Sequence, residues 1–384
     1  MILLALISVS ILIVAIIVRD IRSARRVPQV APLLDERTLP ATVSVIIPAR
    51  NEARNIGRCL AGLAAQPLPG VDVIVLDDNS TDATGEIARS CADQLPGLRV
   101  LRGEPLPSGW AGKCWACWRA AEQSSGEWIL FVDADTAPQP GIIAALLHYA
   151  TVHKLHMVTA LPYIELGSFW ERVLMPPFAG LIQAVIPLDK VNDPRSSHAM
   201  ANGQCILMRR DVYFAVDGHR AVRDSVLEDV RLAQTIKGAG YRIAVVAGPD
   251  LLHVRMYTNG AEVAEGLHKN AAAGARATGR LRTVWAGFRQ TLLATAPSLL
   301  VVIGLVLAVL GSTNAWIFLA FGTGLLIVTT SYWGYIVSQL HRLNPAWAIL
   351  YPFGTLCYFV LATAAMISVA RGRGVVWKGR RYAG

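Results

Sequence analysis

Two aspartates one residue apart, Asp133 and Asp135, are the first residues of this chain whose spacing indicates chemistry. They follow the run 128–132, whose apolar and aromatic residues are typical of a strand buried on both faces. Thr136 and nearby prolines then end the pattern. In an open α/β sheet, ligands bind beyond the carboxyl ends of the strands. Two carboxylates there could hold a hard divalent cation together with phosphate oxygens, and a solvated turn is the alternative.

Two other acidic motifs follow expected strands. Pro48-Ala-Arg-Asn-Glu52 comes after the β-branched run 43–47, and Asp77-Asp78 comes after the apolar run 71–76. Helical patterns separate these runs, and an alternation of strands and helices predicts a mostly parallel, doubly wound sheet. The acids would then meet at one edge of that sheet.

A third acidic pair, Glu228-Asp229, opens an apolar-periodic segment that is expected to be a helix. Acids in the first turn complement the positive end of the helix dipole, and a cap of this kind would explain one of the two. The second acid is therefore a candidate for chemistry.

The composition separates a soluble segment from membrane segments. Of the 384 residues 53% are hydrophobic, and they concentrate in residues 1–18 and in the C-terminal region. The first run lacks a basic n-region and a small-residue cleavage site, so an anchor is favoured over a signal peptide. The segment between has ordinary globular composition and is large enough for its own core.

The net charge of +9 lies mainly beside the apolar runs, in the arginines after residue 18 and in the tail. This placement fits the positive-inside rule and contact with membrane lipids. It argues against nucleic-acid binding, because no basic stripe or binding motif supports that reading. We therefore expect a protein of the cytoplasmic membrane whose soluble domain faces the cytoplasm.

The expected segments run in order along the chain. They are an N-terminal transmembrane anchor (1–18), a juxtamembrane linker (19–40), an α/β domain (41–260), a basic amphipathic connector (261–289), a transmembrane region of about three segments (290–370) and a basic tail (371–384). Four full crossings would put the tail opposite the soluble domain, so a re-entrant segment near Pro345–Pro352 is expected.

Residues 163–194 form an apolar, aromatic-rich stretch inside the α/β segment. Pro176-Pro177 is expected to break it into two helices. A buried helix pair is one interpretation. An interfacial segment on the bilayer is favoured, because the chain is anchored at both ends.

Taken in order, these motifs resemble those of family 2 glycosyltransferases with the GT-A nucleotide-sugar-binding fold, over about residues 41–260. Four short stretches narrow the resemblance to membrane-bound carotenoid glucosyltransferases and hopanoid-associated glycosyltransferases: Gly109–Ala116, Phe169–Glu171, Arg255–Tyr257 and Trp377–Tyr382. The resemblance implies an α/β, Rossmann-like, mostly parallel GT-A domain with N- and C-terminal transmembrane helices.

The resemblance also implies roles for individual residues. Nucleotide-sugar binding would fall to Pro48, Ala49, Arg50, Glu52, Asp77 or Asp78 (the uracil edge), Lys113, Asp133 and Arg255. Asp135 would bind Mg2+ or Mn2+, with Asp133 and His253 as further ligands, and a structural role is the alternative for His253. Asp229 would be the general base and Glu228 would orient it or touch the acceptor.

The implied reaction is an inverting transfer of a hexose, expected to be glucose, from a UDP-sugar to the hydroxyl of an isoprenoid lipid such as a carotenoid. The Gln-x-x-Arg-Trp element of processive polysaccharide synthases is absent, which favours one or few transfers. A polyprenyl-phosphate or hopanoid acceptor is an alternative. An inactive membrane scaffold that retains the fold is a second one.

Overall fold

The computed structural model describes residues 1–34, 41–66, 71–278, 280–371, 375–377 and 380–382. It contains two compact units. The α/β unit comprises Val27–Glu165 and Leu188–Met256, and the helical unit comprises Met1–Arg26, Leu166–Pro187 and Tyr257–Gly384. Parts of the expected linker and of the basic tail, residues 35–40 and 378–379 among them, lie outside the described residues.

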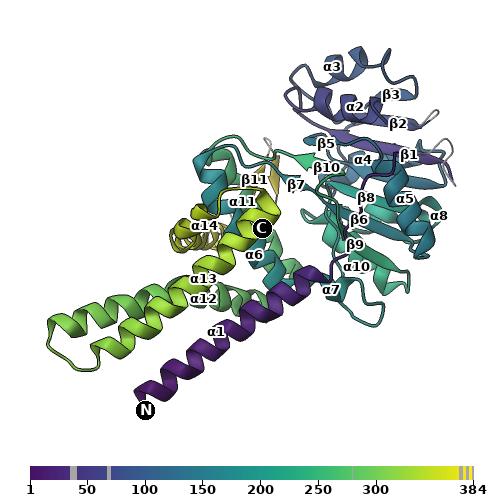
Figure 1. Cartoon of the computed structure of the whole chain (residues 1–384). Coiled ribbons are helices and arrows are strands. Elements are labelled where there is room, and N and C mark those ends of the chain that lie inside the picture. The colour runs from purple at the N-terminus through teal and green to yellow at the C-terminus, as the bar shows by residue number, and fades with distance from the viewer. Residues whose placement is uncertain (35–40, 67–70, 279, 372–374, 378–379, 383–384) are drawn as a thin grey trace. The chain divides into compact units, whose positions relative to one another are not determined.

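A seven-stranded sheet forms the centre of the α/β unit, in the order β3-β2-β1-β4-β8-β6-β9 (Figure 1). The strands are β1 (Val43–Ala49), β2 (Asp72–Asp77), β3 (Leu98–Arg102), β4 (Trp128–Val132), β6 (Met157–Leu161), β8 (Cys205–Arg209) and β9 (Ile243–Ala247). All run parallel except β8, which is antiparallel to both of its neighbours. The expectation of a mostly parallel sheet is therefore confirmed.

The central strands are apolar because both faces of the sheet are covered. Every residue of β4 is buried, and so are all but one of β1. The helices of this unit are α2 (Ile56–Ala64), α3 (Thr84–Ser90), α4 (Gly112–Glu122), α5 (Ile142–Val152), α7 (Leu188–Val191), α8 (Arg210–Ala215), α9 (Gly218–Ala221) and α10 (Glu228–Gly238). The acids Glu228 and Asp229 stand in the first turn of α10, as expected.

A second, small sheet of three strands follows the end of β4. It has the order β5-β10-β7, with β5 at Thr136–Pro138, β10 at Leu252–Val254 and β7 at Tyr163–Ile164. His253 is paired with Ala137 across an antiparallel ladder. This register places His253 beside the segment that carries Asp135.

The helical unit contains α1 (Ile2–Arg25), α6 (Phe169–Val185), α11 (Gly260–Thr278), α12 (Arg280–Val309), α13 (Ala315–His341), η1 (Pro345–Leu350) and α14 (Tyr351–Ala370), with a two-stranded pair β11 (Val375–Trp377) and β12 (Arg380–Tyr382). Figure 1 shows α12 and α13 as a hairpin. Four segments of the described chain are long and apolar enough to cross a membrane: 2–25, 284–309, 315–341 and 345–368.

The expectation that Pro176-Pro177 breaks a helix is wrong, because α6 continues from Phe169 through both prolines to Val185. The carbonyl of Val173 would normally accept from the amide of residue 177, which proline lacks. Gly354 of α14 lies against that carbonyl: a Cβ on Gly354 would be 2.2 Å from the Val173 oxygen. We attribute the continuity of the helix to this contact, in which a neighbouring backbone covers the carbonyl that proline leaves without its helical partner.

Candidate active site

The motifs Pro48–Glu52 and Asp77-Asp78 join the ends of β1 and β2. The amide of Asp78 donates to the carbonyl of Ala49 over 2.8 Å, and the guanidinium of Arg50 donates to the carbonyl of Asp78 over 2.7 Å. Pro48 precedes Ala49 within β1, and Asp77 is the last residue of β2, where its Oδ1 accepts from the amide of Ser80. These residues therefore form one loop cluster at the carboxyl edge of the sheet.

Glu52 is buried in the same cluster, with only 8% of its surface exposed. Its carboxylate accepts from the side chain of Asn55 over 2.8 Å, and its amide donates to the hydroxyl of Thr84 over 2.7 Å. Glu52 is thus held at this edge of the sheet through its carboxylate and through its backbone.

Asp133 stands at the end of β4, where backbone hydrogen bonds hold it in place. Its carbonyl accepts from the hydroxyl of Thr136 over 2.8 Å, and its amide donates to the carbonyl of Gln204 over 3.3 Å. The thiol of Cys59 lies 3.8 Å from the same carbonyl oxygen. Burial raises the pKa of this thiol to about 12, so the thiol stays protonated and unreactive.

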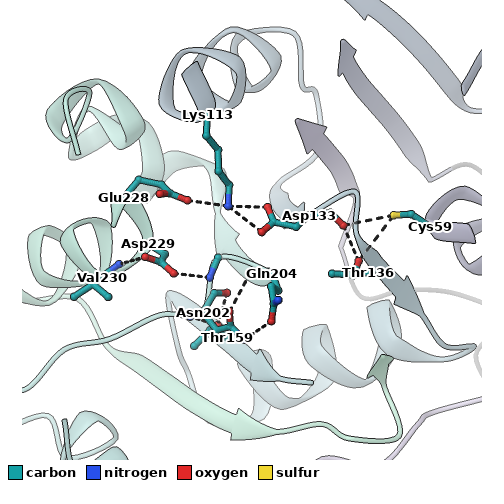
Figure 2. Close-up of polar contacts among 11 residues, drawn as sticks. Cys59, Lys113, Asp133, Thr136, Thr159, Asn202, Gln204, Glu228, Asp229 and Val230 are labelled. Atoms are coloured by element: carbon teal, nitrogen blue, oxygen red, sulfur yellow. Dashed lines mark hydrogen bonds and ion pairs between the residues drawn. The ribbon is translucent and has the colours of Figure 1, made fainter. Parts of the chain in front are cut away.

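Lys113, in the first turn of α4, bridges two acids of the site (Figure 2). Its Nζ lies 2.7 Å and 3.0 Å from the two carboxylate oxygens of Asp133 and 2.8 Å from Oε1 of Glu228. Figure 2 shows the ammonium group directly between the two carboxylates. Lys113 therefore joins the carboxyl end of β4 to the start of α10.

Asp229 is oriented by two backbone amides. Its Oδ2 accepts from the amide of Gly203 over 2.8 Å, and its Oδ1 accepts from the amide of Val230 over 2.8 Å (Figure 2). The side chain is half-buried, whereas Glu228 beside it is buried. The two neighbouring acids thus have different surroundings.

The electrostatics of this cluster separate the two acids further. Burial raises the pKa of Glu228, but the contact with Lys113 outweighs it and the net shift is below the usual value. Burial and the Glu228 charge raise the pKa of Asp229 to about 6. Burial also raises the pKa of Asp133, although Lys113 opposes this shift. Near neutral pH, Glu228 is a fixed anion and Asp229 can gain or lose a proton.

His253 of β10 lies in a second charged cluster. Its Nδ1 is 3.7 Å from Oε1 of Glu165, its ring meets Tyr163 edge-on at 5.3 Å, and Glu165 is paired with Arg58 of α2. The hydrogen bond from Arg58 lowers the pKa of Glu165, and the charges of His253 and Arg255 act in the same direction. No described contact joins Arg255 to the Lys113 cluster.

The residues present fit a divalent cation whose coordination shell is completed by water and substrate phosphates. They do not fit a cation that is coordinated by protein side chains alone. Among the described residues, no group of three or more His, Cys, Asp or Glu side chains is arranged to hold a metal. Mg2+ commonly uses one or two carboxylates, with waters and substrate phosphates as its other ligands. Asp135, directly before β5, and His253, on the paired strand β10, supply a donor set of that kind. Asp133, the third expected ligand, is paired with Lys113.

The structure brings Lys113, Asp133, Glu228 and Asp229 together. It places the motifs Pro48–Glu52 and Asp77-Asp78 side by side at the ends of β1 and β2. Three residues that sequence reasoning assigned no role also belong to the site: Thr159, Asn202 and Gly203. Two signals could have indicated them. One is a single hydroxyl within the apolar strand Met157–Leu161, and the other is the Asn-Gly pair before β8.

Comparison with known proteins gives the following similarities. The profile of the family described as "Glycosyltransferase like family 2" matches residues 40–276. The 4,4'-diaponeurosporenoate glycosyltransferase of Staphylococcus aureus strain USA300 is 28% identical over 240 residues, which is 62% of this chain and 62% of that protein. The protein of the same name from strain MRSA252 is 29% identical over the same length. The match thus spans less than two thirds of these relatives.

Among solved structures, a mannosyltransferase from Pyrobaculum calidifontis in complex with GDP-Man and Mn2+ is similar to this chain. The TM-score is 0.54 at 20% sequence identity, over 91% of this chain and 99% of that one. At this identity the likeness concerns the fold.

Proposed function

Because the chain belongs to the glycosyltransferase family 2-like proteins, we propose that it transfers a hexose, with glucose as the expected sugar, from a UDP-sugar to the hydroxyl of an isoprenoid lipid such as a carotenoid. The reaction is a single displacement that inverts the anomeric configuration. The observation that carries the proposal is the pair of acids at the start of α10, where Lys113 pairs with Glu228 and two backbone amides hold Asp229.

Asp229 is the general base in this proposal. Two amides fix its carboxylate, and a pKa of about 6 lets it accept the proton of the acceptor hydroxyl near neutral pH. Glu228 stays ionised beside Lys113 and orients the start of α10. One acid is thus kept anionic while its neighbour exchanges a proton.

The donor binds at the carboxyl edge of the sheet. Pro48, Ala49, Arg50 and Glu52 line the nucleoside, Asp77 or Asp78 meets the uracil edge, and Arg255 reaches the donor phosphates. Asp135 with His253 would hold Mg2+ or Mn2+, which when bound supplies Lewis-acid stabilisation of the leaving diphosphate. The Pyrobaculum mannosyltransferase, whose fold is similar, was solved with a nucleotide sugar and Mn2+.

The membrane supplies the acceptor in this proposal, with the α/β unit in the cytoplasm and α6 as the interfacial segment. Support comes from the four long apolar segments and from aromatic side chains of the helical unit. Phe169 and Trp170 of α6 are 46% and 42% exposed and contact Trp347 and Phe353. Aromatic residues are enriched where proteins meet the bilayer surface.

A second acceptor class is favoured by the names of the S. aureus relatives, which specify an acid, 4,4'-diaponeurosporenoate. An acidic isoprenoid, whether a carboxylate or a polyprenyl phosphate, reaches the site already ionised. Such an acceptor would not need Asp229 as a base. The choice between a hydroxyl and an acidic acceptor therefore rests on the effect of removing that carboxylate.

The test uses membranes that carry the full chain, supplied with labelled UDP-glucose and Mg2+ or Mn2+. Parallel reactions contain a hydroxylated carotenoid, a carotenoid acid, a hopanoid polyol or a polyprenyl phosphate, and label is followed into the organic phase. We expect label with the hydroxylated carotenoid and its loss in Asp229→Asn. Full turnover of Asp229→Asn would overturn the base assignment, and label only with an acid would replace the acceptor class.

A further inference from the structure

Thr159, at the middle of β6, holds the turn 202–204 that precedes β8. Its hydroxyl oxygen accepts from the amide of Asn202 over 2.9 Å. The same oxygen lies 3.1 Å from the carbonyl of Asn202 and 2.8 Å from the carbonyl of Cys205. Thr159 has no exposed surface, so its hydroxyl acts only through these backbone groups.

The turn connects this buried hydroxyl to both sides of the site (Figure 2). The amide of Gly203 donates to Oδ2 of Asp229 over 2.8 Å, and the carbonyl of Gln204 accepts from the amide of Asp133. The side chains of Asn202 and Gln204 bond to each other over 3.1 Å. The orientation of the Asp229 carboxylate therefore depends on where Thr159 holds the turn.

Position 203 leaves little room for a side chain. A Cβ there would lie 3.0 Å from Nζ of Lys113, 3.2 Å from Oδ2 of Asp229 and 3.3 Å from Oε1 of Glu228. A side chain at this position would press on three charged groups of the site at once. The absence of a side chain at Gly203 thus lets its backbone approach the acids without displacing them.

We propose that Thr159 and Gly203 are positioning residues of the reaction: Thr159 fixes the turn 202–204, and the amide of Gly203 fixes the Asp229 carboxylate toward the acceptor. This inference rests on the proposed role of Asp229 as general base. The amide also favours the ionised form of Asp229, because a hydrogen bond to a carboxylate stabilises its charge.

The other charges around Asp229 come from elements outside the turn 202–204. They are Glu228 on the same helix, Lys113 from α4, and Asp133 at the end of β4 on the far side of Lys113. Displacing the turn removes the amide from Asp229 and leaves these charges. The group that accepts the proton then becomes both misplaced and harder to ionise.

The test compares Thr159→Val, which removes the hydroxyl at nearly constant shape, with Thr159→Ser, which keeps it. Both are measured in membranes carrying the full chain, as kcat, KM for UDP-glucose and the pH dependence of kcat/KM. We expect Thr159→Val to lose about 10²-fold in kcat, as misplaced catalytic groups do. Its KM for UDP-glucose should change less than kcat, and its acidic limb should move to higher pH. Thr159→Ser should restore kcat and the pH profile. Wild-type behaviour of Thr159→Val, or equal losses in both variants, would overturn the proposal.

If Thr159→Val does not fold, Gly203→Ala is the deciding variant. It changes the contact between Gly203 and Asp229 directly, without altering Thr159. A folded Gly203→Ala protein with wild-type kcat and an unmoved acidic limb would overturn the proposal. Asp229→Asn in the same assay separates this inference from the function it rests on. If Asp229→Asn keeps full turnover, the base assignment fails; if it is inactive while Thr159→Val is normal, only the positioning role fails.

Discussion

At the scale of single residues, Lys113 gives the two acids of α10 different properties. Glu228 is 6% exposed and contacts the ammonium group over 2.8 Å, whereas Asp229 is half-buried and bonded to two amides. Adjacent carboxylates in one environment would titrate together. Here Lys113 keeps Glu228 ionised, whereas burial and the charge of Glu228 raise the pKa of Asp229.

The activity should fall in acid as Asp229 becomes protonated. Its pKa is raised to about 6 from a usual value of 3.8, and only the ionised carboxylate accepts a proton. We expect kcat/KM to be flat above about pH 7 and to fall about tenfold per pH unit below the pKa. The profile is measured on membranes with saturating metal, and activity regained on return to neutral pH excludes denaturation. An acidic limb at the usual aspartate value would contradict the assignment.

Replacing Lys113 should affect both stability and the acidic limb. Lys113→Met leaves Glu228 buried without its counter-charge, and breaking a buried pair in this way costs about 3 kcal/mol. The loss of a cation near Asp229 also makes that group harder to ionise, so the limb moves to higher pH. Lys113→Arg keeps the charge and is the matched control. If Lys113→Met had the Tm and the pH profile of the wild type, Lys113 would neither stabilise the fold nor favour the ionised form of Asp229.

The acidic motifs could be found from the sequence because they stand where periodic segments begin or end. Asp133 and Asp135 follow an uninterrupted apolar run, and Glu228-Asp229 opens a helix. The partners of these acids could not be found in this way. Lys113 contacts the acids, and Thr159 contacts the turn that bonds to Asp229, only because of tertiary packing. A threonine within an apolar strand also has many structural explanations. Local pattern therefore located the acids but not what holds them.

At the scale of elements, the direction of β8 and the continuity of α6 were not readable from the sequence. β8 is the only antiparallel strand of the seven-stranded sheet, and its direction depends on the path of residues 162–204 through both units. α6 contains two prolines that would end an isolated helix. Both features are set by neighbouring elements that local propensity does not describe.

Gly354→Ala should disturb the contact that lets α6 continue through its prolines. The new Cβ would lie 2.2 Å from the Val173 carbonyl, a backbone atom that cannot turn away, so α14 and α6 must separate. Overpacking of this kind costs about 1–3 kcal/mol. Gly324→Ala in α13 is the control, since no atom lies within 4 Å of its Cβ. Thermal unfolding in detergent should show a lower Tm for the first variant alone, and equal Tm values would contradict the role of Gly354.

At the scale of the whole molecule, one buried ion pair joins segments from both ends of the helical unit. The guanidinium of Arg289 in α12 pairs with the carboxylate of Asp20 in α1, and each residue is only 2% exposed. The hydroxyl of Tyr332 in α13 donates to the same carboxylate over 3.3 Å, and Gln183 of α6 donates to the Asp20 carbonyl over 3.4 Å. Four helices, from three separate stretches of the chain, thus meet at Asp20, which makes α1 a part of the fold and not only an anchor.

A double-mutant cycle on Asp20 and Arg289 should reveal this coupling. Asp20→Leu or Arg289→Leu alone leaves one buried charge without its partner, at a cost of about 3–5 kcal/mol in the free energy of unfolding. The double variant removes both charges and replaces them with apolar side chains, so it should be more stable than either single variant. The cycle is measured by thermal unfolding of the full chain in detergent, with activity as a second readout. Strictly additive losses would show that the two residues act independently and would contradict the coupling.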